Sequence, residues 1–305
     1  MNKEIKHLIS ANQITNDGLM RLFESTDKIV EKPGVYGKEL AGKVIATMFF
    51  EPSTRTRLSF ESAVQRLGAA LISTENAREN SSNTKGERLE DTIRMVDKFA
   101  DAIIIRHSDD DSADRAASVS RVPIINAGSG AAEHPTQSLL DVYTIYKRKE
   151  RLDNLTVALV GDLKYGRTPH SLIKLLQLFS GQTVYGLSDQ ALELPNEYID
   201  ELEKHGARYE TVKSFNDLPR NLDAIYQTRV QRERINGNPE FKEFNITTEV
   251  MKHFSSETLV LHPLPRVDEI CFGLDYDPRA VYFKQVENGL FVRMAILLDI
   301  LKERK

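Results

Sequence analysis

The chain has 305 residues, 40% hydrophobic and 28% charged, a size and composition that favour a globular protein of two α/β domains. A single cysteine, Cys271, excludes an internal disulfide and a multi-cysteine metal cluster. The formal net charge of -4 argues against broad nucleic-acid binding, but a local arginine cluster that binds a small anion remains compatible with it. Because the sequence shows neither a bilayer-spanning apolar run nor a signal-peptide pattern, we expect a cytoplasmic protein without membrane contact.

The first half of the sequence alternates segments that have the patterns of strands and of helices. Short apolar runs have the length of buried strands, and longer segments with apolar residues three and four positions apart have the spacing of helices. The predicted strands are residues 43–50, 69–73, 102–105 and 122–125, and the predicted helices are residues 15–30, 58–67, 89–99 and 136–146.

The second half repeats this alternation after a charged stretch at residues 147–151. Apolar strands separated by helices predict parallel sheets with right-handed crossovers. We therefore predict an α/β fold of two domains, each a parallel sheet flanked by helices, with a C-terminal helix that packs back on the first domain. The predicted strands are residues 156–160, 183–187, 224–226 and 259–261, and the helices include residues 169–179, 197–205 and 288–302.

Residues 52–57, Pro-Ser-Thr-Arg-Thr-Arg, lie between the first predicted strand and the helix expected to start near Leu58. A helix start offers backbone N–H groups and the positive end of the helix dipole, to which this motif adds hydroxyls and guanidiniums. A Ser/Thr cap with solvated arginines is the alternative, but a cap needs only one hydroxyl. The glycines of a Walker A loop or a Rossmann fingerprint are absent. The motif therefore predicts an anion site.

A second motif, His134-Pro135-Thr136-Gln137, follows the strand at residues 122–125 and a loop expected at residues 126–130. Pro135 suits a first helical turn, so the side chains of His134 and Gln137 should point together from a helix start. A histidine beside proline is, taken alone, more often a capping or packing residue. Ligands of parallel α/β folds bind beyond the strand ends, where such an imidazole can donate to a carbonyl oxygen that gains charge during acyl transfer.

These two motifs, in this order and at this spacing, resemble the aspartate/ornithine carbamoyltransferase family, and the resemblance covers nearly the whole chain. The ornithine branch typically has a cysteine in its His-Pro-x-Gln and His-x-Leu-Pro segments, where this sequence has Thr136 and Pro263. Four further segments resemble the aspartate branch, namely residues 81–87, 160–168, 228–231 and 262–266.

For the first half, the resemblance implies a carbamoyl phosphate site. Arg106 would reach this ligand from the end of its strand, although a strand-end arginine is usually a surface ion-pair partner. His134 would donate to the carbonyl oxygen. The other implied contacts are the phosphate with Arg55, Ser53, Thr54 and Thr56, and the carbamoyl amide with Gln137 and the backbone carbonyls near Leu264 and Pro265.

For the second half, the resemblance implies an aspartate site. Aspartate carries two carboxylates, and Arg167 and Arg229 match the two arginines with which the family binds them, while Gln231 matches a further substrate contact. For each arginine taken alone, the alternative is a surface ion pair, which usually contributes little to stability. Because ornithine has a cationic side chain, Arg229 would repel it and favour aspartate.

Residues 80–86 form a polar loop that, without the resemblance, would be interpreted as solvated. In the family, the matching serine and lysine reach the active site of a neighbouring subunit, so Ser81 and Lys85 imply a homotrimer with shared sites. Glu51 and Arg234 match groups that help to clamp the domains, and ordinary surface charge is the equal alternative.

The resemblance implies that residues 1–149 bind carbamoyl phosphate, that residues 150–287 bind aspartate, and that the helix at 288–305 returns to the first domain. The expected reaction gives N-carbamoyl-L-aspartate and phosphate, a step of pyrimidine biosynthesis that needs no metal or organic cofactor. A carbamoyltransferase for another amine such as ornithine, or a non-catalytic scaffold, are the alternatives. Association with separate regulatory chains is compatible with this expectation.

Overall fold

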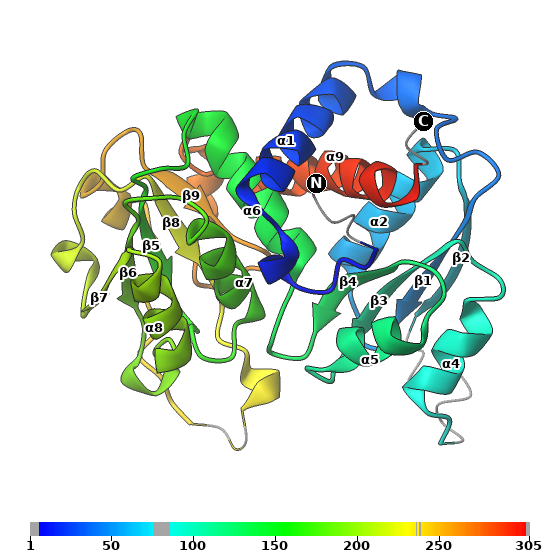
Figure 1. Cartoon of the computed structure of the whole chain (residues 1–305). Coiled ribbons are helices and arrows are strands. Elements are labelled where there is room, and N and C mark those ends of the chain that lie inside the picture. The colour runs from blue at the N-terminus through cyan, green and yellow to red at the C-terminus, as the bar shows by residue number, and fades with distance from the viewer. Residues whose placement is uncertain (1–5, 76–85, 236, 238, 303–305) are drawn as a thin grey trace. The chain divides into compact units, whose positions relative to one another are not determined.

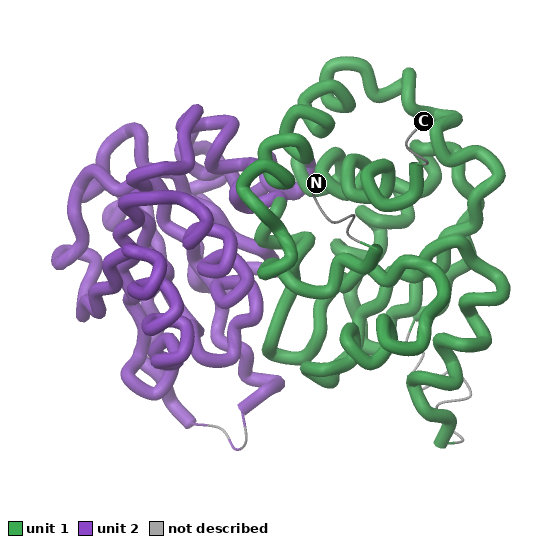
Figure 2. The backbone as a smooth tube through the Cα atoms, in the orientation of Figure 1, with its two compact units in different colours: residues 1–139, 288–305 green, residues 140–287 purple. Residues whose placement is uncertain are grey.

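The computed structural model describes residues 6–75, 86–235, 237 and 239–302. The chain forms two compact units, residues 1–139 with 288–305 (unit 1) and residues 140–287 (unit 2), which Figure 2 shows in green and purple. Among the described residues, no helix combines the length and the hydropathy that a membrane crossing requires.

Unit 1 contains a four-stranded parallel sheet in the order β2-β1-β3-β4. Helices α4 and α5 cover one face, with an apolar cluster that includes Met48, Ile93 and Ile105, whereas α1, α2 and α9 lie on the other face (Figure 1). The strands are β1 (Val44–Phe49), β2 (Ala70–Glu75), β3 (Ala102–His107) and β4 (Ile124–Ser129), and the helices are α1 (Asn16–Glu31), α2 (Thr54–Arg66), α4 (Leu89–Val96) and α5 (Ser112–Val119). Helices α6 (Pro135–Lys149) and α9 (Tyr282–Leu301) are shared with unit 2.

Unit 2 contains a five-stranded parallel sheet in the order β7-β6-β5-β8-β9. Val160 and Ile225 pack on one face against apolar residues of the irregular segment that includes Phe244 and Met251. On the other face, the Tyr226 hydroxyl donates to Asp141 of α6. The strands are β5 (Thr156–Val160), β6 (Thr183–Leu187), β7 (Arg208–Val212), β8 (Ala224–Gln227) and β9 (Leu259–Leu261), with α7 (Arg167–Leu176) and α8 (Asn196–Lys204) between them.

The chain passes between the units twice, and both crossings lie inside helices. One lies in α6, between residues 139 and 140, and the other in α9, between residues 287 and 288. The charged stretch at residues 147–151 lies at the C-terminal end of α6, where Lys147, Arg148 and Lys149 are favourable beside the negative end of the helix dipole. The carboxyl-terminal part of α9 belongs to unit 1, as expected, and Arg293 donates to Ser59 of α2 at 2.8 Å.

The fold class is confirmed, and β5, β6 and β9 have the predicted bounds. Two elements were not predicted. The edge strand β7 is mostly exposed and therefore lacks an apolar run, and α5 is a short helix of small and polar residues. In addition, α9 begins at Tyr282 rather than Asn288.

Two predicted boundaries next to the candidate site are wrong. Helix α2 begins at Thr54 rather than near Leu58, because its first turn carries no apolar periodicity although it is helical. Strand β4 continues through the predicted loop to Ser129. Its Asn126 side chain donates to Ser129 Oγ and accepts from the amide of Gly128, and these bonds lie where the register with β3 shifts.

Candidate active site

The start of helix α2 carries the predicted anion motif. Ser53 is the N-cap, and Thr54, Arg55 and Thr56 form the first turn. The Ser53 side chain makes no capping hydrogen bond, so it does not satisfy the amides of this turn as a conventional N-cap would. This geometry favours an anion site over a simple cap.

The two guanidiniums of the motif have different surroundings. Arg57 pairs with Glu75 at the end of β2, with 2.9 Å between Nη2 and the carboxylate, and lies 4.0 Å from Glu61. Arg55 has an exposed side chain on the first turn itself. The motif adds both guanidiniums as donors, and the family resemblance names only Arg55 for the phosphate. The structure pairs Arg57 with carboxylates of its own unit.

His134 and Thr56 come together from distant parts of the sequence. Helix α6 begins at Pro135, directly after β4 and its connection, so His134 lies at the helix start. Its Nε2 is 3.3 Å from Thr56 Oγ1, and both side chains are buried, at 4% and 7% exposure. Gln137, also buried, lies in the first turn of the same helix, and its backbone N–H donates to the His134 carbonyl. The two predicted motifs therefore meet within unit 1.

Arg106 lies near the carboxyl end of β3, on the side of the sheet where α2 and α6 begin. It pairs in register with Phe49, the last residue of β1, and its carbonyl accepts from the amide of Phe50. Its guanidinium is 2.7 Å from the Glu51 carboxylate. Arg106 is thus placed beside the connection from β1 to α2. Glu51, predicted as a domain clamp, engages this arginine within unit 1.

In unit 2, the ends of β5 and β8 approach each other closely. Gly161 follows β5 with φ of 108°, and a Cβ on it would lie 2.1 Å from the Thr228 carbonyl oxygen, so only glycine fits. The buried Asp162 then accepts from the amides of Lys164 and Tyr165 through Oδ1 and of Gln231 through Oδ2. One carboxylate therefore ties the loop that leads to Arg167 to the loop that carries Arg229.

The burial of Asp162 raises its pKa above the ordinary value, and the three amide hydrogen bonds oppose that rise. Sequence reasoning included Asp162 in a family segment but assigned it no role. An acidic residue directly after a buried strand and a glycine is the signal that would have indicated one. Asp162 positions loops, because it accepts from the amide of Gln231, which lies 69 residues away in the sequence.

The two predicted carboxylate-binding arginines differ in their surroundings. Arg167 is buried, at 6% exposure, in the first turn of α7. Arg229 follows β8 and forms a two-pronged ion pair with Glu233, which raises the pKa of the guanidinium. Gln231 donates to the Arg229 carbonyl at 3.2 Å, so it orders the same loop. Arg234, the other predicted clamp, donates to the Tyr165 carbonyl within unit 2.

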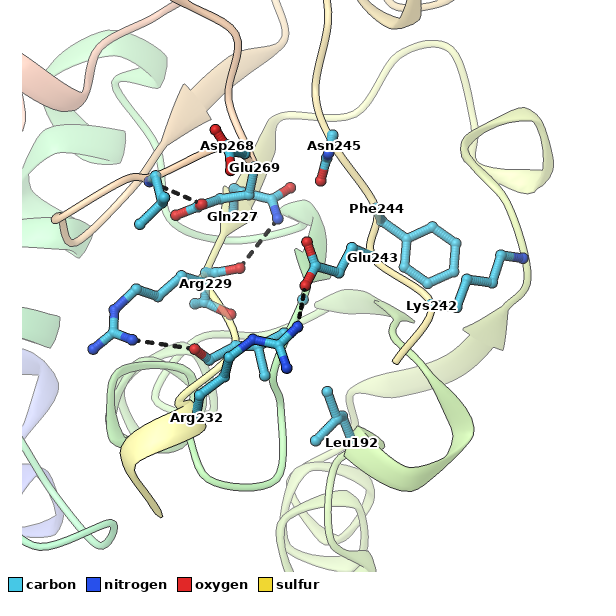
Figure 3. Close-up of a pocket in the computed structure, with 14 residues that line it drawn as sticks. Leu192, Gln227, Arg229, Arg232, Lys242, Glu243, Phe244, Asn245, Asp268 and Glu269 are labelled. Carbon is cyan, nitrogen blue, oxygen red and sulfur yellow. Dashed lines mark hydrogen bonds and ion pairs between the residues drawn. The ribbon is translucent and has the colours of Figure 1, made fainter. Parts of the chain in front are cut away.

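A pocket of about 310 Å³ opens beside Arg229 in unit 2. Figure 3 shows Arg229 and Arg232 along one side and Gln227 and Glu269 along another, with Arg232 paired to Glu243. The volume is at the lower end of the range of small-ligand pockets. Within the described residues, no group of three or more His, Cys, Asp or Glu side chains is arranged to hold a metal ion.

Leu264 and Pro265 form a turn after β9, joined by a cis peptide bond. The amide of Leu264 donates to Nδ1 of His262 at 2.7 Å, and the other ring nitrogen lies 2.8 Å from Glu269 Oε1. The turn is therefore held from inside unit 2. Ser81 and Lys85 lie outside the described residues.

The fold and these two groups of residues define an α/β protein of two parallel-sheet units, with arginine side chains near the carboxyl ends of the strands in each. Residues 6–147 match the family described as "Aspartate/ornithine carbamoyltransferase, carbamoyl-P binding domain", and residues 153–300 match "Aspartate/ornithine carbamoyltransferase, Asp/Orn binding domain". The chain belongs to the aspartate/ornithine carbamoyltransferase family.

Relatives from distant organisms agree with this assignment. The chain is 44% identical to an aspartate carbamoyltransferase catalytic subunit from Parabacteroides distasonis, over 97% of either chain. It is 41% identical to the one from Methanocaldococcus jannaschii, over 99% of each. Its structure resembles that of aspartate transcarbamoylase from Trypanosoma cruzi in complex with carbamoyl phosphate and aspartate, with a TM-score of 0.91, 35% identity and coverage of 98% of both chains.

Proposed function

We propose that this chain is an enzyme that transfers the carbamoyl group of carbamoyl phosphate to the amine of L-aspartate, giving N-carbamoyl-L-aspartate and phosphate. The observation that carries this proposal is the meeting of Thr56, at an uncapped helix start, with His134 at 3.3 Å. Family membership and relatives named aspartate carbamoyltransferase support it. The reaction belongs to pyrimidine biosynthesis.

In the proposed site, unit 1 binds carbamoyl phosphate. Arg55 and the first-turn groups of Ser53, Thr54 and Thr56 hold the phosphate, because a helix start and a guanidinium both stabilise an anion. Arg106 binds the same ligand, and His134 donates to the carbonyl oxygen. Gln137 binds the carbamoyl amide together with the carbonyls of Leu264 and Pro265. Residues 1–149 supply most of these groups.

Residues 150–287 bind aspartate in this proposal, and residues 288–305 return to the first domain. Arg167 and Arg229 each bind one carboxylate, and Gln231 makes a further contact. Asp162 supports the assignment, because it holds the loops of all three residues in one arrangement. A cationic acceptor such as ornithine is disfavoured beside Arg229.

The proposed mechanism has one addition and one elimination. The amine nitrogen of aspartate attacks the carbonyl carbon, an oxyanion forms, and the carbon–oxygen bond to phosphate breaks, with phosphate taking the amine proton. Holding both substrates in attack geometry contributes roughly 7–11 kcal/mol in well-oriented reactions. Each preorganised donor on the oxyanion contributes about 2.7–4 kcal/mol, and His134, Arg55 and Arg106 are the candidates. These steps require no covalent intermediate, metal or organic cofactor.

The direct test is to offer the purified chain carbamoyl phosphate with a panel of amino acids and to follow phosphate release. Aspartate should be the preferred acceptor by a wide margin. Preference for ornithine or another amine would refute the specificity, and no release with any acceptor would favour a non-catalytic scaffold.

We also propose that the active form is a cytoplasmic homotrimer in which Ser81 and Lys85 complete a neighbouring subunit's site, a form compatible with separate regulatory chains. The basis is the family resemblance of residues 81–87. Mixing inactive Lys85→Ala and Arg55→Ala chains should restore part of the activity, because some sites in hybrid trimers receive both native residues. Absence of any rescue in confirmed hybrids would contradict shared sites.

A further inference from the structure

The turn after β9 has a backbone conformation that its sequence does not favour. Leu264 has φ of 56°, in the left-handed region, which residues other than glycine seldom adopt. Such a conformation persists where the surrounding structure holds it. The groups that hold this turn are therefore informative about what the turn does.

His262 is the side chain that holds it. The ring is buried, at 1% exposure, and lies between the amide of Leu264, 2.7 Å from Nδ1, and the carboxylate of Glu269, 2.8 Å from Nε2. Because a backbone N–H only donates, Nδ1 is the acceptor and carries no proton. The ring proton is then on Nε2 and is donated to Glu269. This geometry selects one neutral tautomer.

Glu269 and the backbone of His262 are themselves held by further hydrogen bonds. The second oxygen of Glu269 accepts from the amide of Val267 at 3.0 Å, so one carboxylate closes the segment that follows the turn. The amide of His262 donates to Gln285 Oε1, and the Gln285 side-chain amide donates to the buried Asp141. His262 is thus connected through its backbone amide to α9 and α6, and through its ring to the turn and to Glu269.

We propose that His262 is a positioning residue for the carbamoyl transfer. Its unprotonated Nδ1 accepts from the Leu264 amide and so fixes the turn whose carbonyls, those of Leu264 and Pro265, bind the carbamoyl amide. This inference rests on the proposed function, which assigns those two carbonyls to the substrate. A histidine that served only as packing would need neither this tautomer nor a specific acceptor at Nδ1.

Two isosteric variants separate the two ring nitrogens. His262→Asn places an oxygen near Nδ1 that accepts from an amide two residues on, as in an Asx-turn. His262→Gln places an amide donor near Nε2 but removes that acceptor. His262→Gln should raise the KM for carbamoyl phosphate about tenfold, the change expected for one lost hydrogen bond, while the KM for aspartate changes little. His262→Asn should stay within about threefold of the native KM.

The contrast between the variants decides the proposal. Equal KM changes in both variants would mean that the ring acts by packing alone and would overturn it, as would native KM values in both. Thermal unfolding of each variant shows whether a change reflects the turn or the whole unit. If both unfold, Glu269→Gln provides the second route. Its amide cannot accept both hydrogen bonds, so it should raise the same KM, and unchanged kinetics would overturn the proposal.

A measurement independent of activity separates this inference from the proposed function. The ¹⁵N resonances of the His262 ring in the native protein should show Nδ1 without a proton and Nε2 with one. A protonated Nδ1 in an active enzyme would refute the inference alone. The expected tautomer in a protein that fails to carbamoylate aspartate would refute the proposed function instead.

Discussion

The candidate site residues of unit 1 and of unit 2 are held in place by different means. In unit 1, the candidate anion-binding residues lie at helix starts: Thr54 to Thr56 form the first turn of α2, and His134 directly precedes α6. In unit 2, buried carboxylates hold the loops. Asp162 ties the Arg167 loop to Gln231, and Glu269 closes the segment after Leu264.

This difference predicts different consequences of substitution. A side chain on a regular helix start can be removed while the backbone keeps its own hydrogen bonds, so activity should fall and stability should not. A buried carboxylate that accepts several amides leaves those donors without partners when it is removed, which costs about 1–3 kcal/mol for each amide that water cannot reach. Unit 2 should therefore lose stability and substrate binding together.

The largest expected effect is a loss of turnover in Arg55→Ala, for which Arg57→Ala is the matched control. Loss of a preorganised donor typically lowers kcat about 10²–10³-fold, which we expect for Arg55→Ala without a change in unfolding midpoint. Arg57 pairs with Glu75, so its removal should change kcat by less than about threefold. Steady-state kinetics on both variants test this. Equal losses in kcat would show that both arginines act in catalysis and would contradict the assignment of the phosphate to Arg55 alone.

The next effect is on unit 2, through Asp162→Ala. The amides of Lys164, Tyr165 and Gln231 lose their acceptor, while the removal of a buried charge offsets part of the loss. We expect a decrease of about 2–3 kcal/mol in the free energy of unfolding, measured in urea, and a raised KM for aspartate. Asp162→Asn keeps one acceptor oxygen and should lose less. Full stability with a changed KM would contradict the coupling.

The smallest effect concerns an ion pair of unit 1 away from the site. Glu90 accepts from Arg115 at 2.8 Å, and this hydrogen bond is the main reason that its pKa falls from 4.5 to about 2. A lowered pKa stabilises the fold above pH 4.5, and this contribution is lost as the pH falls toward 2.

The free energy of unfolding of the native protein should therefore exceed that of Glu90→Gln by at most about 1 kcal/mol at neutral pH, and this difference should disappear in acid. Urea unfolding between pH 6 and about pH 2.5 measures it. The pH dependence expected from Asp162 has the opposite sign. Burial raises its pKa, so the cost of burying its charge is relieved as the pH falls. A gap for Glu90→Gln that widened in acid would contradict the assignment.

Much of unit 1's site was predictable because its signals are local. The hydroxyls and arginines of residues 53–57 indicated an anion at a helix start, and His134-Pro135 indicated a second helix start. The boundaries failed where local signals are weak, since the first turn of α2 has no apolar period and β4 ends in small polar residues. The ion pair of Arg57 with Glu75 was also not predictable from the motif, because Glu75 lies on another strand.

The amino-acid sequence by itself determined the alternation of strands and helices, the two parallel sheets and the residue types at the strand ends. Apolar periodicity and helix-start chemistry act over a few residues, and so they can be read from the chain. Tertiary structure decided which of these residues meet. Thr56 reaches His134 across 78 residues, and Gln231 reaches Asp162 across 69. Such contacts depend on the order in which the strands pair, which no local pattern encodes.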